Sequence, residues 1–212
     1  MTSDNAFSPS EFDPWADSYD HDVESLNKFP FDGYERVLET VVELASPKRG
    51  MKVVDLGTGT GNLALRFAEL GCDLWCSDFS EAMLIKAREK LTQAHFVLHD
   101  LRADWPGELA SNFDRIVSAY VFHHFDLKEK VRLCDELVTR HLSFDGRLIV
   151  GDLSFQNKKE MDDFARSVAE LWEAEPYWLA NESLPALEDA GMKVNYVQVS
   201  RCAGVYSITR RT

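Results

Sequence analysis

The sequence predicts an α/β fold built on a seven-stranded, mostly parallel sheet flanked by helices. From residue 51 onward, short runs rich in Val, Ile and Leu alternate with segments whose apolar residues recur at helical spacing. A glycine-rich turn at 57–61 directly follows the first of these runs. In sheets of this kind, a glycine-rich loop follows the first strand. Near the C-terminus, two β-rich runs joined by Ala203 and Gly204 predict an antiparallel hairpin strand at the sheet edge.

Five short runs rich in apolar residues define the parallel part of the sheet. They are Lys52–Leu56, Asp73–Ser77, His95–Leu98, Phe113–Ala119 and Arg147–Gly151. The terminal hairpin adds two more strands, Lys193–Ser200 and Val205–Thr209.

Helices are expected between these strands and outside them. Ser80 is placed to cap the helix after the second strand. Asn157, with an acid three positions later, predicts an added helix after the fifth strand. A short helix at 184–190 should end at Gly191, a typical C-cap residue, and an amphipathic stretch at 34–44 precedes the first strand.

Composition and charge favour one acidic domain. The 212 residues are 45% hydrophobic with only 7 Pro, which suits a single sizeable core. No apolar run approaches a membrane span, so we expect a cytoplasmic protein without a membrane partner, as a monomer or a homodimer. The net charge of -13 would repel a phosphate backbone, so nucleic acid is not expected as a partner.

The cysteine pattern predicts neither disulfides nor a metal site. The four cysteines are scattered among apolar neighbours and lack C-x-x-C spacing. We therefore expect reduced core thiols and no bound metal. The four are Cys72, Cys76, Cys134 and Cys202.

The glycine-rich turn and an acid downstream together predict a site for an adenosine-type ligand. Gly57, Gly59 and Gly61 lack side chains, which lets a ligand approach the backbone closely. Asp78 ends the second strand, at the usual distance for a carboxylate that accepts hydrogen bonds from both ribose hydroxyls.

Asp55, at the end of the first strand, distinguishes between two ligand classes. A carboxylate there would repel the pyrophosphate of a dinucleotide, but it would attract the ammonium of S-adenosylmethionine by ~1 to 4 kcal/mol. The turn also reads G-x-G-x-G and has Asn62 where the dinucleotide fingerprint has its third glycine.

Five segments, in their order and spacing, resemble the class I S-adenosylmethionine-dependent methyltransferases, which have a Rossmann-like sheet. They are VVDLGTGTG, LWCSDFSEAML, FVLHDLRADWP, FDRIVSAYVFHHF and DGRLIVGD. The resemblance extends over about residues 10–155 and implies S-adenosylmethionine as the cofactor. More narrowly, FDPWADSYD, GTGNLAL and VFHHFDLKEK are similar to the uncharacterised YrrT-like small-molecule methyltransferases.

The resemblance also implies a set of cofactor-binding residues. Asp55 would face the amino group, Asp78 the ribose, and Asp100 with the Leu101 backbone the adenine, while Tyr19 would reach the cofactor's carboxylate. Asp100 also ends an apolar run at the carboxyl edge of the third strand, although a turn or N-cap role explains it too. The full set is Tyr19, Asp55, Gly57, Thr58, Gly59, Gly61, Asp78, Phe79, Met83, Asp100, Leu101 and Ser118.

The single domain, 1–212, is expected to have four parts, the first of which is either a lid over the site or a surface helix. They are an N-terminal helical lid (1–48), a cofactor-binding core (49–152), an added helix over the acceptor site (153–182), and a C-terminal helix with a β-hairpin (183–212). Aromatic residues in the first and third parts favour a planar or apolar small acceptor, or else belong to the core. They are Trp15, Tyr19, Trp172, Tyr177 and Trp178.

His123 and His124 are the candidate catalytic residues. They follow the fourth strand, on the side where the acceptor should bind. One of them could deprotonate an acceptor, or the pair could hydrogen-bond loop carbonyls. Neighbouring residues of an extended chain point in opposite directions, so both can face the site only if the chain turns.

The preferred hypothesis is O- or N-methylation of a small-molecule acceptor by in-line methyl transfer. Two alternatives remain at this stage. One is a regulatory protein that binds S-adenosylmethionine or S-adenosylhomocysteine without turnover, because no indispensable catalytic side chain stands out in the sequence. The other is an NAD(P)-dependent oxidoreductase, which the acid at Asp55 disfavours.

Overall fold

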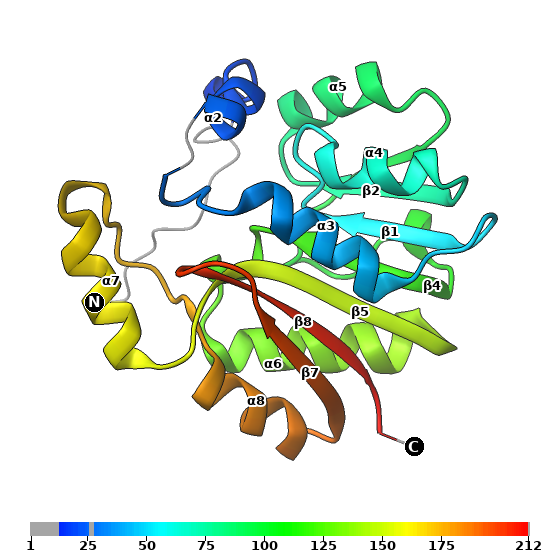
Figure 1. Ribbon diagram of the computed structural model, residues 1–212. Helices are drawn as coiled ribbons and strands as arrows, with labels where there is room; N and C mark the ends of the chain where they lie inside the picture. The colour runs from blue at the N-terminus through cyan, green and yellow to red at the C-terminus, as the bar shows by residue number, and fades with distance from the viewer. Residues whose placement is uncertain (1–12, 26–27, 212) are drawn as a thin grey trace.

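An eight-stranded sheet forms the centre of the structure, a computed structural model that describes residues 13–25 and 28–211 (Figure 1). The strands are β1 Lys52–Leu56, β2 Asp73–Asp78, β3 His95–Leu98, β4 Phe113–Ala119, β5 Leu142–Phe155, β6 Trp178–Leu179, β7 Met192–Gln198 and β8 Ala203–Arg210. They run in the order β3-β2-β1-β4-β5-β8-β7, and β6 pairs with β5 beside this path. β1 to β5 are parallel to one another, and β8 is antiparallel to both of its neighbours.

The predicted fold class, a mostly parallel sheet with a C-terminal antiparallel hairpin, is confirmed. β8 lies inside the sheet, between β5 and β7, so β7 forms the edge. β5 extends beyond the predicted 147–151 at both ends. Leu142 pairs with Phe113 across a register shift in β4, and Ser154 pairs with Trp178 of β6. A two-residue strand such as β6 is too short to give a periodic signal in the sequence.

Helices cover both faces of the sheet. They are α2 Tyr19–Ser25, α3 Tyr34–Ala45, α4 Asn62–Glu69, α5 Glu81–Lys90, α6 Leu127–Glu136, α7 Lys158–Val168 and α8 Ala180–Asp189. The two predicted caps are present: Ser80 Oγ accepts from the Met83 amide, and Asn157 Oδ1 accepts from the Glu160 amide. Asp126 and Glu129 add a capping box at the start of α6.

Alternation along the central strands separates two apolar clusters, because successive side chains of a strand point to opposite faces. Val53 packs with residues of α3 and α4. Val54 packs on the other side with residues of α6 and α8. All four cysteines are free, and three of them are buried. Within the described part of the chain, no helix is long and apolar enough to cross a membrane.

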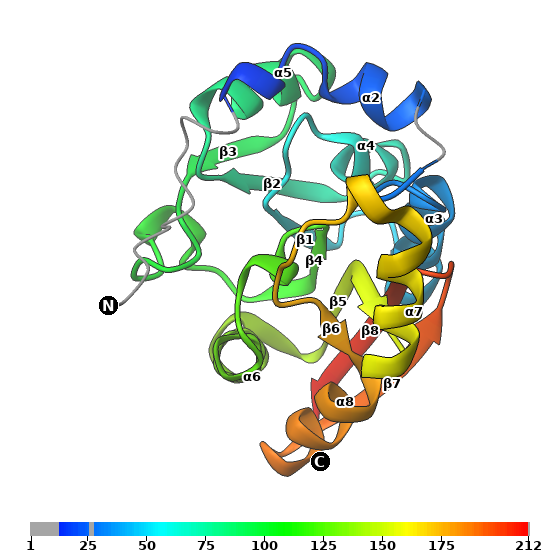
Figure 2. The same cartoon turned by 90° about the vertical axis from the view of Figure 1, so that its left-hand side faces the viewer.

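The carboxyl ends of the parallel strands meet the N-terminal segment and α7 at one end of the sheet (Figures 1 and 2). Asp20 of α2 fastens that segment to the core, since its carboxylate accepts from Thr60 Oγ1 at 2.6 Å, Asn62 Nδ2 at 3.0 Å and Lys90 Nζ at 2.6 Å. Asp13 adds a contact with Ser80 Oγ at 2.6 Å. These bonds hold α2 over the glycine-rich turn.

Candidate functional site

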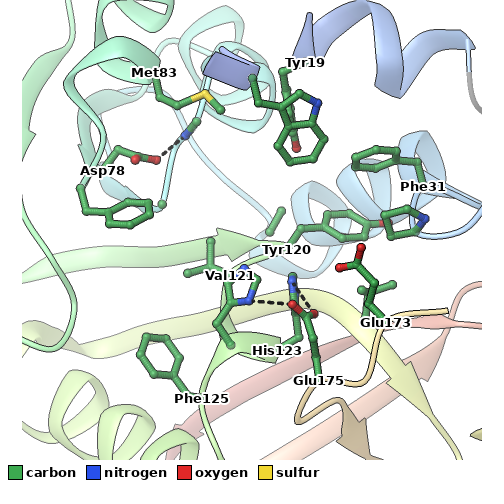
Figure 3. A pocket seen from close by; sticks show the side chains of 18 of the residues that line it. Tyr19, Phe31, Asp78, Met83, Tyr120, Val121, His123, Phe125, Glu173 and Glu175 are labelled. Atoms are coloured by element: carbon green, nitrogen blue, oxygen red, sulfur yellow. Dashed lines mark hydrogen bonds and ion pairs between the residues drawn. The ribbon is translucent and has the colours of Figure 1, made fainter. Parts of the chain in front are cut away.

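A cavity of about 820 Å³ lies at the carboxyl edge of the sheet. Its wall combines the loops that follow β1, β2, β3 and β4 with parts of the N-terminal segment and of the connection 170–177 between α7 and β6. Figure 3 shows Asp78 and Met83 on one side of the cavity and His123 with Glu175 on the other. The volume is in the range that small-molecule sites occupy.

Most of the residues that the sequence predicts for the site line this cavity. They are Tyr19, Gly57, Gly59, Asp78, Phe79, Met83, Asp100, Leu101, His123 and His124. Asp55 and Thr58 instead line an adjoining cavity of about 30 Å³, which shares Gly57 with the larger one. Gly61 and Ser118 line neither of these two cavities.

The three glycines of the turn have positive φ angles but different surroundings. A Cβ on Gly57 would lie 2.3 Å from a methyl group of Val121, and one on Gly61 would lie 3.1 Å from Leu91. A Cβ on Gly59 would meet no atom within 4 Å. Packing therefore excludes a side chain at Gly57, whereas at Gly61 a side chain would need Leu91 to move by a few tenths of an ångström. At Gly59, with φ +54°, the missing side chain leaves space open at the cavity wall.

Asp78 connects the end of β2 to two loops and borders the cavity. It is 5% exposed, Oδ2 accepts from the Gly59 amide at 2.8 Å, and Oδ1 accepts from the Ser80 amide at 2.9 Å. Burial raises its pKa to about 6, although these backbone hydrogen bonds act in the opposite direction. The carboxylate is thus held rigidly at the position predicted for ribose recognition.

Asp55 is buried at the end of β1 with half of its carboxylate unsatisfied. It is 1% exposed, and Oδ2 accepts from Thr58 Oγ1 at 2.8 Å. Oδ1 has no hydrogen-bond partner within the described ranges 13–25 and 28–211. Burial raises the pKa of Asp55 to about 7, and the nearby charge of Asp78 adds to the effect. A cationic group bound nearby would satisfy Oδ1 and favour the ionised form.

Asp100 and Ser118 illustrate two ways in which a strand end is used. Asp100 lines the cavity and also closes a turn, because Oδ1 accepts from the Arg102 amide at 2.9 Å. Ser118 is fully buried, and its hydroxyl donates to the Leu56 carbonyl at 2.7 Å, which joins β4 to β1. The residue after it, Ala119, lines the cavity.

His123 and His124 both reach the cavity because the chain turns there. Residues Phe122–His124 form a 3-10 turn two residues after β4, so the two side chains are not on opposite faces of an extended segment. Their ring centroids are 3.9 Å apart. Burial lowers the pKa of His124 to about 4, so its imidazole is neutral at pH 7.

Asp152 of β5 orients His123. Its Oδ1 lies 2.6 Å from His123 Nδ1 and also accepts from the Leu153 amide at 2.8 Å. The indole Nε1 of Trp178 donates to Oδ2 at 3.1 Å. Burial by itself would raise the pKa of Asp152, but His123 and the ammonium of Lys130 outweigh it and lower the pKa. A buried carboxylate thus fixes the histidine and leaves Nε2 facing the cavity side.

Glu175 completes a polar cluster with the two histidines (Figure 3). Oε2 lies 3.5 Å from His123 Nε2, and Oε1 lies 3.4 Å from His124 Nδ1. Burial would raise the pKa of Glu175, but both histidines counteract this effect and lower it. The cluster thus places imidazole nitrogens and carboxylate oxygens on one wall of the cavity.

Sequence reasoning missed Asp152 and Glu175. Asp152 had a usable signal, because it follows an apolar run at the carboxyl edge of a strand, as Asp100 does. Glu175 had none, since it lies in an irregular connection far along the chain from His123.

The aromatic residues expected near the acceptor divide between wall and core. Trp15, Tyr19 and Tyr177 line the cavity. Trp172 packs against Phe29, with ring centroids 5.4 Å apart, and Trp178 is fully buried. Four aromatic side chains that were not predicted also line the cavity. They are Phe29, Phe31, Tyr120 and Phe125.

These features fit an adenosine-type ligand with a cationic amino acid end. Asp78 borders the large cavity at the end of β2, and Gly59 leaves space beside it. The unsatisfied Oδ1 of Asp55 provides a buried acceptor for a cation. The cation could reach it through the small cavity, which Asp55 lines and which adjoins the large one. A second negative charge, such as a pyrophosphate, would be repelled at this position.

Comparison with known proteins finds relatives for most of the chain. Residues 53–146 match a family model described as a methyltransferase domain. An uncharacterized methyltransferase of Anoxybacillus flavithermus is 36% identical over 154 residues, which are 70% of this chain and 68% of that protein. The uncharacterized methyltransferase YrrT of Bacillus subtilis is 31% identical over 149 residues, which are 69% of this chain and 67% of that protein.

Among solved structures, the magnesium protoporphyrin IX methyltransferase of Synechocystis with bound SAH is similar in fold. The two structures superimpose with a TM-score of 0.71, and the match covers 95% of this chain and 97% of that chain. Their sequences are 18% identical. The similarity therefore concerns the arrangement of the sheet and helices.

Proposed function

Because the chain belongs to the class I S-adenosylmethionine-dependent methyltransferases and uses that cofactor, we propose that it methylates an O or N atom of a small-molecule acceptor. One observation supports this most strongly: a single cavity of about 820 Å³ extends from Gly59 and Asp78 to the cluster around His123. In-line transfer needs the cofactor and the acceptor in one enclosed space, with the nucleophile on the axis of the breaking bond.

The predicted cofactor residues would act in the following way. Asp78 accepts from the ribose hydroxyls, Asp55 compensates the ammonium, and the Gly59 backbone lies against the ligand. Asp100 and Leu101 flank the adenine at the end of β3. When bound, S-adenosylmethionine supplies a methyl group on a positively charged sulfur.

We place the acceptor at the opposite end of the cavity. There His123 and His124 would stabilise the acceptor's reacting atom as it loses its proton, and aromatic side chains would pack against its apolar part. The apolar walls near Phe31 and Tyr120 favour a compact, planar or apolar molecule (Figure 3). The name of the Synechocystis neighbour, a magnesium protoporphyrin IX methyltransferase, also gives a small molecule as its acceptor.

The N-terminal part, 1–48, would act as the lid over this site, through its described residues 13–25 and 28–48; residues 1–12 and 26–27 lie outside the described part of the chain. Trp15 and Tyr19 contact each other edge to face, at 4.8 Å between centroids, and both line the cavity. Such a cover excludes water, which would otherwise separate the reacting groups. In the same proposal, 49–152 binds the cofactor, 153–182 covers the acceptor and 183–212 completes the sheet edge.

The charge and the free cysteines support a cytoplasmic protein that acts on small molecules. A net charge of -13 disfavours a nucleic-acid substrate, and four free thiols suit a reducing compartment.

Calorimetry with S-adenosylhomocysteine, NAD⁺ and NADH under identical conditions tests the cofactor assignment. We expect micromolar binding of S-adenosylhomocysteine alone. An acceptor screen that detects release of S-adenosylhomocysteine then tests methylation of O and N nucleophiles. Binding of a nicotinamide nucleotide in place of S-adenosylhomocysteine would contradict the proposal, and binding without turnover across the screen would favour a regulatory protein.

A further inference from the structure

We propose that His123, His124 and Glu175 bind a divalent transition-metal ion at the acceptor end of the cavity. The three residues present one ligand atom each, and these atoms lie within 4.8 Å of one another. The role of the ion in catalysis rests on the proposed function above, but its binding does not.

Two distances, one to each oxygen of Glu175, are close to the separation of neighbouring ligand atoms around a metal ion. Glu175 Oε2 is 3.5 Å from His123 Nε2, and Oε1 is 3.4 Å from His124 Nδ1. These separations are longer than a good hydrogen bond, which has ~2.7 to 3.2 Å between heavy atoms. In a tetrahedral zinc site with bonds of ~2.1 Å, two ligand atoms are about 3.4 Å apart. A cation between the three groups therefore suits the spacing better than a shared proton.

The orientation of His123 leads to the same conclusion. Asp152 Oδ1 lies 2.6 Å from His123 Nδ1 and holds that nitrogen away from the cavity. The other ring nitrogen, Nε2, lies 3.5 Å from Glu175 Oε2. A metal ion between these two atoms would take an electron pair from each of them.

The surroundings are those of a supported metal site. A carboxylate that holds the second nitrogen of a ligand histidine is a recurrent outer-sphere partner in metal sites. Here Asp152 has this position and is itself fixed by the Leu153 amide and by Trp178 Nε1. The segment that carries Glu175 is also held in place, because the buried Lys130 donates to the carbonyl of the next residue, Pro176.

Three protein ligands leave a coordination position open toward the cavity, as in catalytic zinc sites. Since all three residues line the cavity, an acceptor oxygen or nitrogen could occupy that position. The ion would lower the pKa of the acceptor, whose proton passes to water. The acceptor's lone pair would then form a bond to the methyl carbon while the carbon–sulfur bond breaks and its electron pair goes to sulfur.

The test is a metal titration of the full-length protein, without an affinity tag and after treatment with a chelator. Calorimetry with Zn²⁺ and visible absorption with Co²⁺ report the site without any acceptor. We expect one ion per chain and cobalt bands typical of nitrogen and oxygen ligands. Glu175→Gln and His124→Ala should each weaken binding at least about tenfold, and Asp152→Asn about 10- to 100-fold.

His95→Ala is the matched control. His95 forms a histidine–carboxylate pair with Asp73 at 3.8 Å, but it is exposed and does not line the cavity. We expect its metal affinity to equal that of the wild type, and every variant should bind S-adenosylhomocysteine normally. The absence of stoichiometric metal binding, or binding that persists in both Glu175→Gln and His124→Ala, would overturn the site. Loss of S-adenosylhomocysteine binding by the wild type would instead overturn the proposed function.

Discussion

The two ends of the cavity are built in different ways. At the cofactor end, Asp55, Gly59 and Asp78 lie within 24 positions of one another in the sequence, and the Asp78 carboxylate accepts from the Gly59 backbone amide. At the acceptor end, His123 and Glu175 come from distant parts of the chain, and His123 contacts both Glu175 and Asp152 through its side chain. One end relies on backbone geometry, whereas the other relies on side chains that only the fold brings together.

This difference indicates which property of the protein a substitution at each end would change. All three glycines of the turn are constrained. Val121 and Leu91 lie close to the two outer glycines, and the ligand expected beside Gly59 restricts the middle one. The acceptor cluster depends on individual side chains, so a single substitution can change its chemistry without moving the sheet. We therefore expect substitutions at the two ends to separate cofactor affinity from turnover.

Gly59→Val should have the largest effect. The new side chain would fill the space predicted for the ligand, and we expect S-adenosylhomocysteine affinity in calorimetry to fall at least about 1,000-fold. Gly50→Val is the matched control, because Gly50 also has a positive φ, at +80°, and open surroundings but does not line the cavity. Both variants carry similar backbone strain, so equal affinities in the two would contradict a ligand-facing Gly59.

Asp78→Ala should weaken S-adenosylhomocysteine binding by about 3 kcal/mol, or about 150-fold. The loss corresponds to two hydrogen bonds between a charged acceptor and hydroxyl donors, at ~1.5 kcal/mol each. Asp73→Ala, at the exposed start of the same strand, is the control. Near-wild-type affinity of a folded Asp78→Ala protein in calorimetry would remove Asp78 from the site.

His124→Ala should reduce turnover about 100-fold and leave S-adenosylhomocysteine affinity within about threefold of wild type. Its imidazole lines the acceptor end of the cavity. Initial rates with an acceptor found by screening, together with calorimetry, separate the two effects. Equal losses of turnover and of cofactor affinity would show that the two ends are not independent.

Cofactor binding should weaken in acid. The pKa values of Asp78 and Asp55 in the ligand-free protein are about 6 and about 7, and binding favours both ionised forms. We expect S-adenosylhomocysteine affinity to fall at least about tenfold from pH 8 to pH 5. Asp55→Asn should shift this dependence to lower pH, and a flat profile would show that neither carboxylate is linked to binding.

Asp78 and Asp55 affect the stability of the ligand-free protein with the opposite pH dependence. Both folded-state pKa values lie above the ~3.9 of an unfolded aspartate, so the folded chain holds more protons between about pH 4 and pH 7. Their contribution to the free energy of unfolding is therefore present at low pH and lost as the pH rises through 6 and 7. The increase in Tm caused by S-adenosylhomocysteine should consequently grow with pH in that range.

Tyr19→Phe should have the smallest effect, about a fivefold loss of S-adenosylhomocysteine affinity, which corresponds to ~1 kcal/mol for one hydroxyl. The aromatic contacts of Tyr19 with Trp15 and Phe31 would persist in the variant. Tyr196→Phe in β7 removes a hydroxyl outside the cavity and is the control. An unchanged affinity would indicate that only the ring of Tyr19 belongs to the lid.

Local patterns predicted most of the fold and the cofactor end. The first four strands agree with the predicted bounds to within one residue, and the caps at Ser80 and Asn157 form as expected. Such signals depend on neighbours in the sequence, so they can be read without the fold. The bounds of β5 and the existence of β6 could not be predicted, because both depend on pairing with strands far along the chain.

The sequence by itself determined the parallel sheet, the glycine-rich turn and the acids at the ends of the first strands, because strand alternation, capping and turn chemistry are local. Only the tertiary structure decided that the chain turns after β4 so that His123 and His124 face the same cavity. It also decided that Glu175 reaches them and that Asp152 lies behind His123. Side-chain clusters of this kind depend on long-range packing, which no local pattern encodes.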